Sequence, residues 1–369
     1  MVVTGARQTG KTSLLRHTFP DHGFVSLDLP SEAELAEHSP ETFFERHPPP
    51  VIIDEVQYAP ALFRHLKARI DANRSANGQW LLTGSRRFPL MRHVGDSLAG
   101  RIGLIELDTL SFSEVQRAFP GSDALSWIVR GGFPELWAQP EIDAREFQRA
   151  YLVSYLERDL RSLLQVTHLR DFERFMRACA LRSGQLLNKS DVARDIGVSM
   201  PTVTSRLGAL EASGVVAMLE PWFQKGTRAL TKSPKLYFRD TGLLLALLNL
   251  RDDAALSESP LRGAVFETAI YGTLRRALEL RGELESLFFF RQNQREVDFL
   301  VHRGGRFDLF ESKWTEVPDP RDAQAMQRVA EVLGPANVRR RFIVCRCRHR
   351  THVDETCEAV PLEALAEVS

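Results

Sequence analysis

The sequence predicts an α/β fold that opens with a parallel β-sheet covered by helices. Short apolar segments at 24–29, 51–54, 79–83 and 102–107 have the length and composition of buried strands. They alternate with segments of helical period such as 59–73. This alternation is typical of a parallel sheet with helices on both faces. We therefore expect the first part of the chain to form one α/β domain.

The first expected strand leads into a complete phosphate-binding pattern, G-x-x-x-x-G-K-[ST]. The residues expected to contact a nucleotide are Gly5, Ala6, Arg7, Gln8, Thr9, Gly10, Lys11, Thr12 and Ser13. The glycines let backbone N–H groups point at the β-phosphate, while Lys11 reaches the β- and γ-phosphates and Thr12 ligates Mg²⁺. The alternative is a Gly-rich turn that binds nothing. The full pattern is far more demanding than such a turn and predicts nucleotide binding.

An acidic pair at the end of the strand expected at 51–54 fits the same site. Asp54 would hold the Mg²⁺ ion, and Glu55 would polarise the attacking water. The next strand ends in a run of small polar residues, so Thr83 or Ser85 is a candidate sensor of the γ-phosphate. A buried strand that merely stops at a glycine turn is the alternative. The combination predicts a Mg²⁺-dependent nucleotide hydrolase.

Two further features concern this domain. Arg101 precedes the strand expected at 102–107, where it could complete the site in cis or reach the site of a neighbouring copy in a homo-oligomer. An exposed arginine without such a role is the alternative. Only residues 1–4 are left for the strand that feeds the phosphate loop, whereas strands usually have five or six residues. We therefore expect the first strand to be truncated.

Composition limits the classes of protein that remain. The 369 residues suggest two or three domains. The 48 basic and 48 acidic residues cancel, so affinity for nucleic acid must come from a local patch. Four scattered cysteines do not form a disulfide scaffold, and no apolar stretch approaches the length of a membrane span. We expect a cytoplasmic protein without a membrane partner.

The middle of the chain is predicted to be helical and then to form a helix-turn-helix. Residues 144–164 carry apolar side chains at helical spacing, and the charged cluster at 157–159 is expected to lie on a solvated or ion-paired face. Segments 187–199 and 200–210 read as two short helices joined by a turn. In such a motif, Thr202, Ser205 and Arg206 point toward a DNA major groove.

A basic stretch without acids follows at 222–239 and is predicted to form a wing that turns at Gly226. Its basic residues are Lys225, Arg228, Lys232, Lys235 and Arg239. The winged helix is interpreted equally well as a DNA-binding element and as a protein-packing scaffold.

The last third contains a second group of chemically active side chains. Glu267 lies on an expected helix, Asp298 on an expected strand, and Glu311 and Lys313 on a later strand. Because strand side chains alternate, Glu311 and Lys313 share a face. If the strands are neighbours, Asp298 and Glu311 can bind Mg²⁺ while Lys313 assists hydrolysis of a phosphodiester. An ordinary ion pair on an exposed strand is the alternative.

These motifs together resemble a known family. The segments 4–12, 53–57, 82–85 and 98–101, with 155–160, 234–243 and 296–299, are similar to those of prokaryotic AAA+-superfamily ATPases fused to a C-terminal domain of unknown function. The resemblance covers nearly the whole chain. The family's C-terminal domain is related to PD-(D/E)XK nucleases. The departure is at the amino end, where the family usually has an additional helix and a full first strand.

The resemblance implies roles for individual residues. Lys11, Thr12, Asp54 and Glu55 would form the ATP site. In the C-terminal domain, the nuclease-like residues would be Asp298, Glu311 and Lys313, with Glu267 as the helix acid.

The expected organisation has four parts. They are a P-loop NTPase domain with a parallel sheet at 1–110, a helical connector at 111–182, a winged helix-turn-helix at 183–240 and a restriction-endonuclease-like α/β domain at 241–369. We expect a protein that binds and hydrolyses ATP and acts with DNA. A further hypothesis is that it cleaves DNA as a metal-dependent nuclease. One alternative is a nucleotide-driven switch for protein interactions whose nuclease-like domain is not catalytic. A DNA-binding regulator with a vestigial ATP site is a third reading, and the intact Glu55 argues against it.

Overall fold

The computed structural model describes residues 1–84, 98, 100–155, 169–223, 233–293 and 295–368. It divides into two compact units. The first comprises residues 1–109 with 212–214, and the second comprises residues 110–211 with 215–369.

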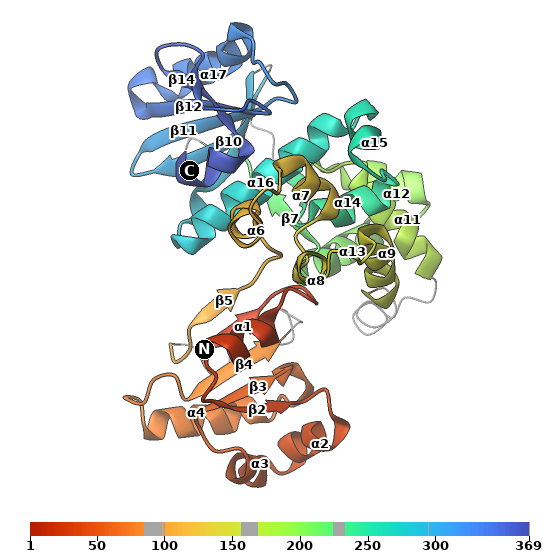
Figure 1. Cartoon of the computed structure of the whole chain (residues 1–369), viewed down its shortest axis with the longest axis vertical. Helices are drawn as coiled ribbons and strands as arrows, with labels where there is room; N and C mark the ends of the chain where they lie inside the picture. Colours follow the sequence, from red (N-terminus) through yellow and green to blue (C-terminus); the bar gives the residue numbers. More distant parts are fainter. Residues whose placement is uncertain (85–97, 99, 156–168, 224–232, 294, 369) are drawn as a thin grey trace. The chain divides into compact units, whose positions relative to one another are not determined.

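The first unit contains a five-stranded parallel sheet (Figure 1). In spatial order its strands are β2 (Gly23–Ser26), β3 (Val51–Asp54), β4 (Trp80–Gly84), β1 (Val2–Thr4) and β5 (Leu104–Glu106). The predicted parallel α/β sheet is confirmed, although β2 and β5 are shorter than expected. The three-residue β1 is buried between β4 and β5.

Helices cover both faces of this sheet because its side chains alternate. The helices are α1 (Lys11–Thr18), α2 (Pro30–His38), α3 (Pro40–Arg46) and α4 (Leu62–Ala72). Val3, Ile52 and Leu81 pack with Leu15 of α1 in one core. The adjacent residues of the same strands point to the opposite face of the sheet. There they form a second core with residues of α2, α3 and α4. Both α2 and α3 begin with proline, which is favoured in the first helical turn because it lacks an N–H group.

The second unit begins with helices and a small antiparallel sheet. The helices are α6 (Phe112–Ala118), α7 (Ala124–Arg130), α8 (Pro134–Ala138), α9 (Ala144–Tyr155), α11 (Leu169–Ala180), α12 (Lys189–Ile196), α13 (Met200–Ala212), α14 (Thr241–Leu248) and α15 (Asp253–Glu258). The sheet places β8 (Lys235–Phe238) between β6 (Gln185–Leu186) and β7 (Val216–Leu219). The predicted helix at 144–164 is α9 up to residue 155, and the charged cluster at 157–159 lies outside the described residues.

A six-stranded mixed sheet with helices on both faces completes the second unit (Figure 1). Its strands, in spatial order, are β13 (Thr351–His352), β14 (Cys357–Pro361), β12 (Val338–Cys345), β11 (Arg306–Ser312), β10 (Arg295–Arg303) and β9 (Leu287–Gln292). One face packs with α16 (Arg262–Leu280) and α18 (Leu365–Val368), and the other with α17 (Pro320–Leu333). Among the described residues, no helix is both long enough and apolar enough to cross a membrane.

One hydrophobic core runs through the whole second unit. It includes Phe112 near its start, Leu236 of the small sheet, Phe266 of α16 and Val368 at its end. The segments predicted at 111–182, 183–240 and 241–369 are therefore packed around a shared core. Sequence periodicity shows where each element lies, but it does not show that the apolar faces of separate segments meet.

Candidate functional site

The phosphate loop joins β1 to α1 at the carboxyl edge of the first sheet. Gly5 has a φ of 144°, and a Cβ atom there would lie 2.1 Å from the backbone oxygen of Leu107. Gly10 caps α1 with a φ of 85°. No side chain fits at Gly5, and left-handed backbone such as that of Gly10 favours glycine. The two glycines of the sequence pattern are thus explained by the backbone path of the loop.

Lys11 folds back across this loop. Its Nζ atom donates hydrogen bonds to the backbone oxygens of Gly5, at 3.2 Å, and Ala6, at 2.6 Å. The Thr9 hydroxyl also donates to Ala6 O, at 3.0 Å. The ammonium of Lys11 is therefore held at the loop by hydrogen bonds rather than extended into solvent.

Asp54 is surrounded by hydroxyl groups from three other elements. Thr12 of α1 and Thr83 of β4 donate to its Oδ1 atom at 2.6 and 2.5 Å. Ser26 of β2 donates to Oδ2 at 3.3 Å. The structure thus brings together the predicted Thr12, Asp54 and Thr83. Ser26 was not predicted, and its only signal in the sequence is its position at the end of the strand that pairs with β3.

Glu55 follows β3 directly and turns the chain sharply. Its φ of 55° is unusual for a residue with a side chain. Its backbone N–H donates to Thr83 Oγ1 at 3.0 Å, and its carboxylate accepts a hydrogen bond from Gln57. Thr83 therefore contacts both acids, whereas the other predicted sensor, Ser85, lies outside the described residues.

The donor atoms at this site suit Mg²⁺. The Thr12 hydroxyl and the Asp54 carboxylate are hard oxygen ligands that already lie in contact. These two residues would hold the ion.

The structure does not bring Arg101 to the phosphate loop of its own chain. Arg101 precedes β5 and lies at the amino edge of the parallel sheet, whereas the phosphate loop follows the carboxyl end of β1. Its guanidinium pairs with Asp71 through contacts of 2.8 and 3.1 Å, and hydrogen bonds from Arg101 and Arg74 lower the pKa of Asp71 to about 2. The role in a neighbouring copy stays a prediction.

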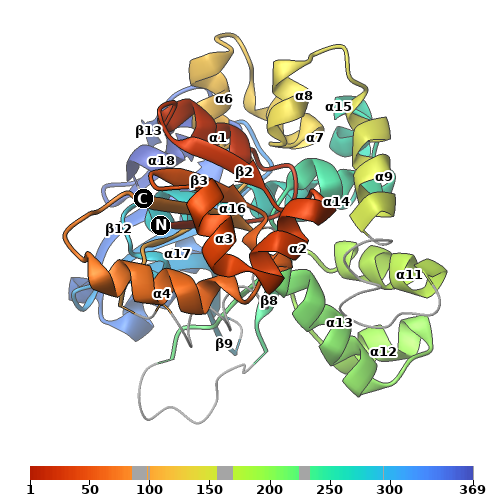
Figure 2. The ribbon, with the colours of Figure 1, turned by 90° about the horizontal axis from the view of Figure 1, so that it is seen from below.

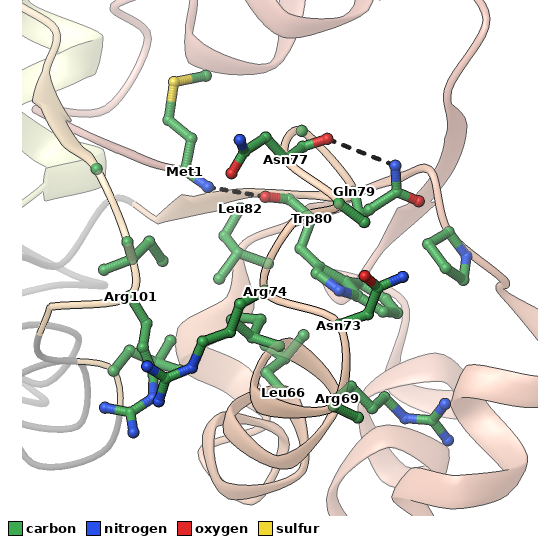
Figure 3. A pocket seen from close by; sticks show the side chains of 18 of the residues that line it. Met1, Leu66, Arg69, Asn73, Arg74, Asn77, Gln79, Trp80, Leu82 and Arg101 are labelled. Atoms are coloured by element: carbon green, nitrogen blue, oxygen red, sulfur yellow. Dashed lines mark hydrogen bonds between the residues drawn. The ribbon is translucent and has the colours of Figure 1, made fainter.

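Arg101 lines a cavity of about 640 Å³ at that amino edge (Figure 3). Met1, Arg74 and Trp80 also line it, and the backbone nitrogen of Met1 donates to Trp80 O at 2.8 Å. The phosphate loop does not line this cavity, so the cavity is separate from the candidate nucleotide site.

The predicted acids of the second unit also converge. Glu267 comes from α16, Asp298 from β10 and Glu311 from β11. Lys235 contacts both Glu267 and Asp298, and the backbone N–H of Ser312, next to Glu311, donates to Asp298 Oδ2 at 3.0 Å. Burial, followed by the charge of Asp298, raises the pKa of Glu267 to about 7 and that of Glu311 to about 8. We call these three residues the carboxylate cluster.

Two lysines form ion pairs with the carboxylate cluster. Lys313 donates to Glu311 Oε1 at 3.1 Å, as expected from their spacing. Lys235 of β8 lies 3.0 Å from Glu267 Oε1 and 3.2 Å from Asp298 Oδ1. Among the described residues, no group of three acidic, histidine or cysteine side chains is arranged to hold a metal ion. The acids predicted as metal ligands are thus paired with ammonium groups.

The burial of Lys235 was not predicted from the sequence. Lys235 was predicted to be a basic side chain of the wing, but only 3% of it is exposed. Tyr237, two residues later on the same strand, donates to Glu267 Oε1 at 2.6 Å. Lys235 and Tyr237 are two residues apart on one strand and therefore share a face, but this spacing does not indicate which acids they contact. Arg239 is also buried, while Lys225, Gly226, Arg228 and Lys232 lie outside the described residues.

The predicted recognition helix, α13, follows α12 after a turn at Gly197 (Figure 2). Arg206 does not point to solvent as expected. Its guanidinium lies over the rings of Phe172 and Phe175 of α11 and donates to the backbone oxygen of Asp171. Ser205 is exposed, so it remains available on the outer face of α13.

Comparison with known protein families identifies three segments. Residues 1–116 match an AAA domain, residues 121–254 match a domain of unknown function (DUF8612), and residues 262–365 match another domain of unknown function (DUF4143). The phosphate loop, its acidic strand and the AAA match define the first unit as an AAA-type P-loop ATPase domain.

Two uncharacterized mycobacterial proteins are similar to the whole chain. They are Rv2008c of Mycobacterium tuberculosis and Mb2031c of Mycobacterium bovis, each 31% identical over 371 residues, with 99% of this chain and 80% of the mycobacterial chain covered. The chain therefore belongs to the same protein family as these two proteins.

Solved structures give weaker similarities. The branch migration motor RuvB of Thermotoga maritima is 17% identical, with a TM-score of 0.27 and coverage of 58% of this chain and 80% of RuvB. The ORC1 protein of Aeropyrum pernix, solved with DNA, is 14% identical, with a TM-score of 0.28 and coverage of 70% and 86%. Protein VC1899 of Vibrio cholerae is 14% identical, with a TM-score of 0.24 and coverage of 100% and 95%. TM-scores this low do not define a shared overall fold.

Proposed function

We propose that the AAA domain hydrolyses ATP with Mg²⁺. The observation that carries this proposal is the contact of Asp54 with the hydroxyls of Thr12 and Thr83, directly beside Glu55. A nucleotide switch needs a phosphate loop and a metal ligand, but only a hydrolase also needs a side chain that positions the attacking water, a role that Glu55 can fill. When bound, Mg²⁺ would neutralise charge on the phosphate oxygens.

Two substitutions separate binding from hydrolysis. Lys11→Ala should lose ATP binding, because it removes the charge that faces the phosphates. Glu55→Gln should bind ATP normally but lower kcat by about 100-fold or more. The substitution removes the general base for the attacking water and leaves the phosphate-binding residues unchanged. Nucleotide affinity and phosphate release measure the two effects.

Lys67→Ala and Glu45→Gln are matched controls on exposed residues of the same unit. The assignment fails if Lys11→Ala binds ATP as tightly as the wild-type protein does.

We also propose that the second unit acts on DNA as a metal-dependent nuclease. The support is the convergence of Glu267, Asp298 and Glu311 with Lys313, in the order expected for such a site. The pairing of Lys235 with two of these acids favours the alternative, a nucleotide-driven interaction switch without cleavage.

Asp298→Asn tests the nuclease proposal. The substitution removes a ligand charge, so it should abolish Mg²⁺- or Mn²⁺-dependent nicking of supercoiled DNA and leave ATP turnover unchanged. ATP turnover is the internal control for an intact AAA domain, and circular dichroism checks the fold of the second unit. If the wild-type protein with ATP and either metal produces no cleavage that Asp298→Asn removes, the interaction switch is the better description.

A further inference from the structure

Lys235 is the most completely enclosed cation of the carboxylate cluster. Its ammonium contacts Glu267, Asp298 and also Glu296, whose Oε1 lies at 3.2 Å. An ammonium group has three N–H donors, so three carboxylate partners use its full capacity. A buried lysine stays charged only with such partners, and these three acids raise the pKa of Lys235 despite its burial.

The strand that carries Lys235 belongs to another sheet. β8 is the central strand of the three-stranded sheet, whereas the acids lie on α16 and on the six-stranded sheet. Tyr237 of the same strand adds a hydrogen bond to Glu267. β8 therefore brings a cation and a hydroxyl into a cluster built by other elements.

The cluster still has unused capacity for a cation. Glu311 Oε2 is buried and has no hydrogen-bond partner among the described residues, while Lys313 pairs with the other oxygen. A buried acceptor without a partner is costly, and it points to a group that the remaining side chains do not supply. A divalent cation has the charge and the preference for carboxylate oxygens that fit this position.

We propose that Lys235 is a tethered cation that competes with a divalent metal ion for the carboxylate cluster. A metal ion held by Glu267 and Asp298 would displace the Lys235 ammonium from these two acids, and Glu311 Oε2 would supply a further ligand. The inference rests on the metal-binding role proposed above for Asp298 and Glu311, but not on ATP hydrolysis or on DNA cleavage.

Removing the ammonium tests the competition. Lys235→Met should bind Mn²⁺ at least tenfold more tightly than the wild-type protein does, as measured from the paramagnetic resonance signal of free Mn²⁺ without nucleotide. Lys235→Arg keeps the charge and should match the wild-type protein. Adding Glu311→Gln to Lys235→Met should remove the gain, which assigns the new site to the cluster.

Lys235→Gln provides a second variant that retains two N–H donors, and it decides the question if Lys235→Met does not fold. Circular dichroism checks the fold of each protein. Mn²⁺ affinity within twofold of wild type in a folded Lys235→Met or Lys235→Gln protein overturns the proposal. A variant that binds Mn²⁺ tightly but leaves DNA intact supports the competition and contradicts only the nuclease proposal.

Discussion

Thr83 connects the two acids of the nucleotide site. Its hydroxyl donates to Asp54 and accepts from the backbone N–H of Glu55, so its single donor is used and its acceptor is engaged. The sequence predicted Thr83 or Ser85 as the sensor of the γ-phosphate. The register of β4 against β3 brings the Thr83 side chain to the end of the acidic strand, whereas Ser85 lies outside the described residues, so both stay predictions.

Glu311 and Glu267 should make the stability of the protein depend on pH. Their pKa values are raised by burial from 4.5 to about 8 and about 7, so the folded protein holds protons that the unfolded chain releases. Their contribution to stability is complete below about pH 4 and is lost as the pH rises through 7 to 8. Lys235 and Lys313 are charged in both states throughout this range.

We therefore expect the free energy of unfolding to fall between pH 5 and 8, by up to about 1.4 kcal/mol per pH unit for each group. Urea unfolding of the wild-type protein and Glu311→Gln at several pH values measures the slope. The substitution should flatten it, whereas Glu331→Gln, an exposed control, should not. Equal slopes in wild type and Glu311→Gln would contradict the raised pKa.

At the scale of elements, α13 shows how a residue that looks functional can be structural. Arg206 occupies a recognition-helix position in the sequence, yet it packs on two phenylalanine rings of α11, and burial lowers its pKa. Among the basic residues predicted to contact DNA from the wing, Lys225, Arg228 and Lys232 lie outside the described residues and stay predictions.

Replacing Lys225, Arg228 and Lys232 together with alanine should weaken DNA binding for all sequences alike. With fewer phosphate contacts, fewer counterions are released when the protein binds DNA. The slope of log affinity against log salt concentration should therefore flatten by about one unit per lost contact. Arg206→Ala is the matched control, because it should lower the melting temperature and leave the slope unchanged. An unchanged slope in the triple variant would assign the winged segment to protein packing.

At the scale of the whole molecule, the sequence predicted features that follow from local patterns, such as strands and the phosphate loop. It did not predict side-chain contacts between elements that are far apart in the chain. The parallel sheet and its phosphate loop follow from strand periodicity and from an eight-residue pattern. Glu267, Asp298 and Glu311 were predicted from their order on successive elements. Lys235 could not be predicted, since it reaches Asp298 from 63 residues away through a strand of another sheet. The amino-edge position of Arg101 likewise depends on sheet order.

The location of Lys235 also determines how the second unit can be divided. A fragment that starts at residue 241 would contain the carboxylate cluster and Lys313 but would lose Lys235 and the Tyr237 hydroxyl. It would also expose the part of the shared core that packs around Leu236. A fragment boundary chosen from sequence motifs would therefore separate the Lys235 ammonium from Glu267 and Asp298. For expression, residues 110–369 are therefore better kept together in one fragment than divided at residue 241.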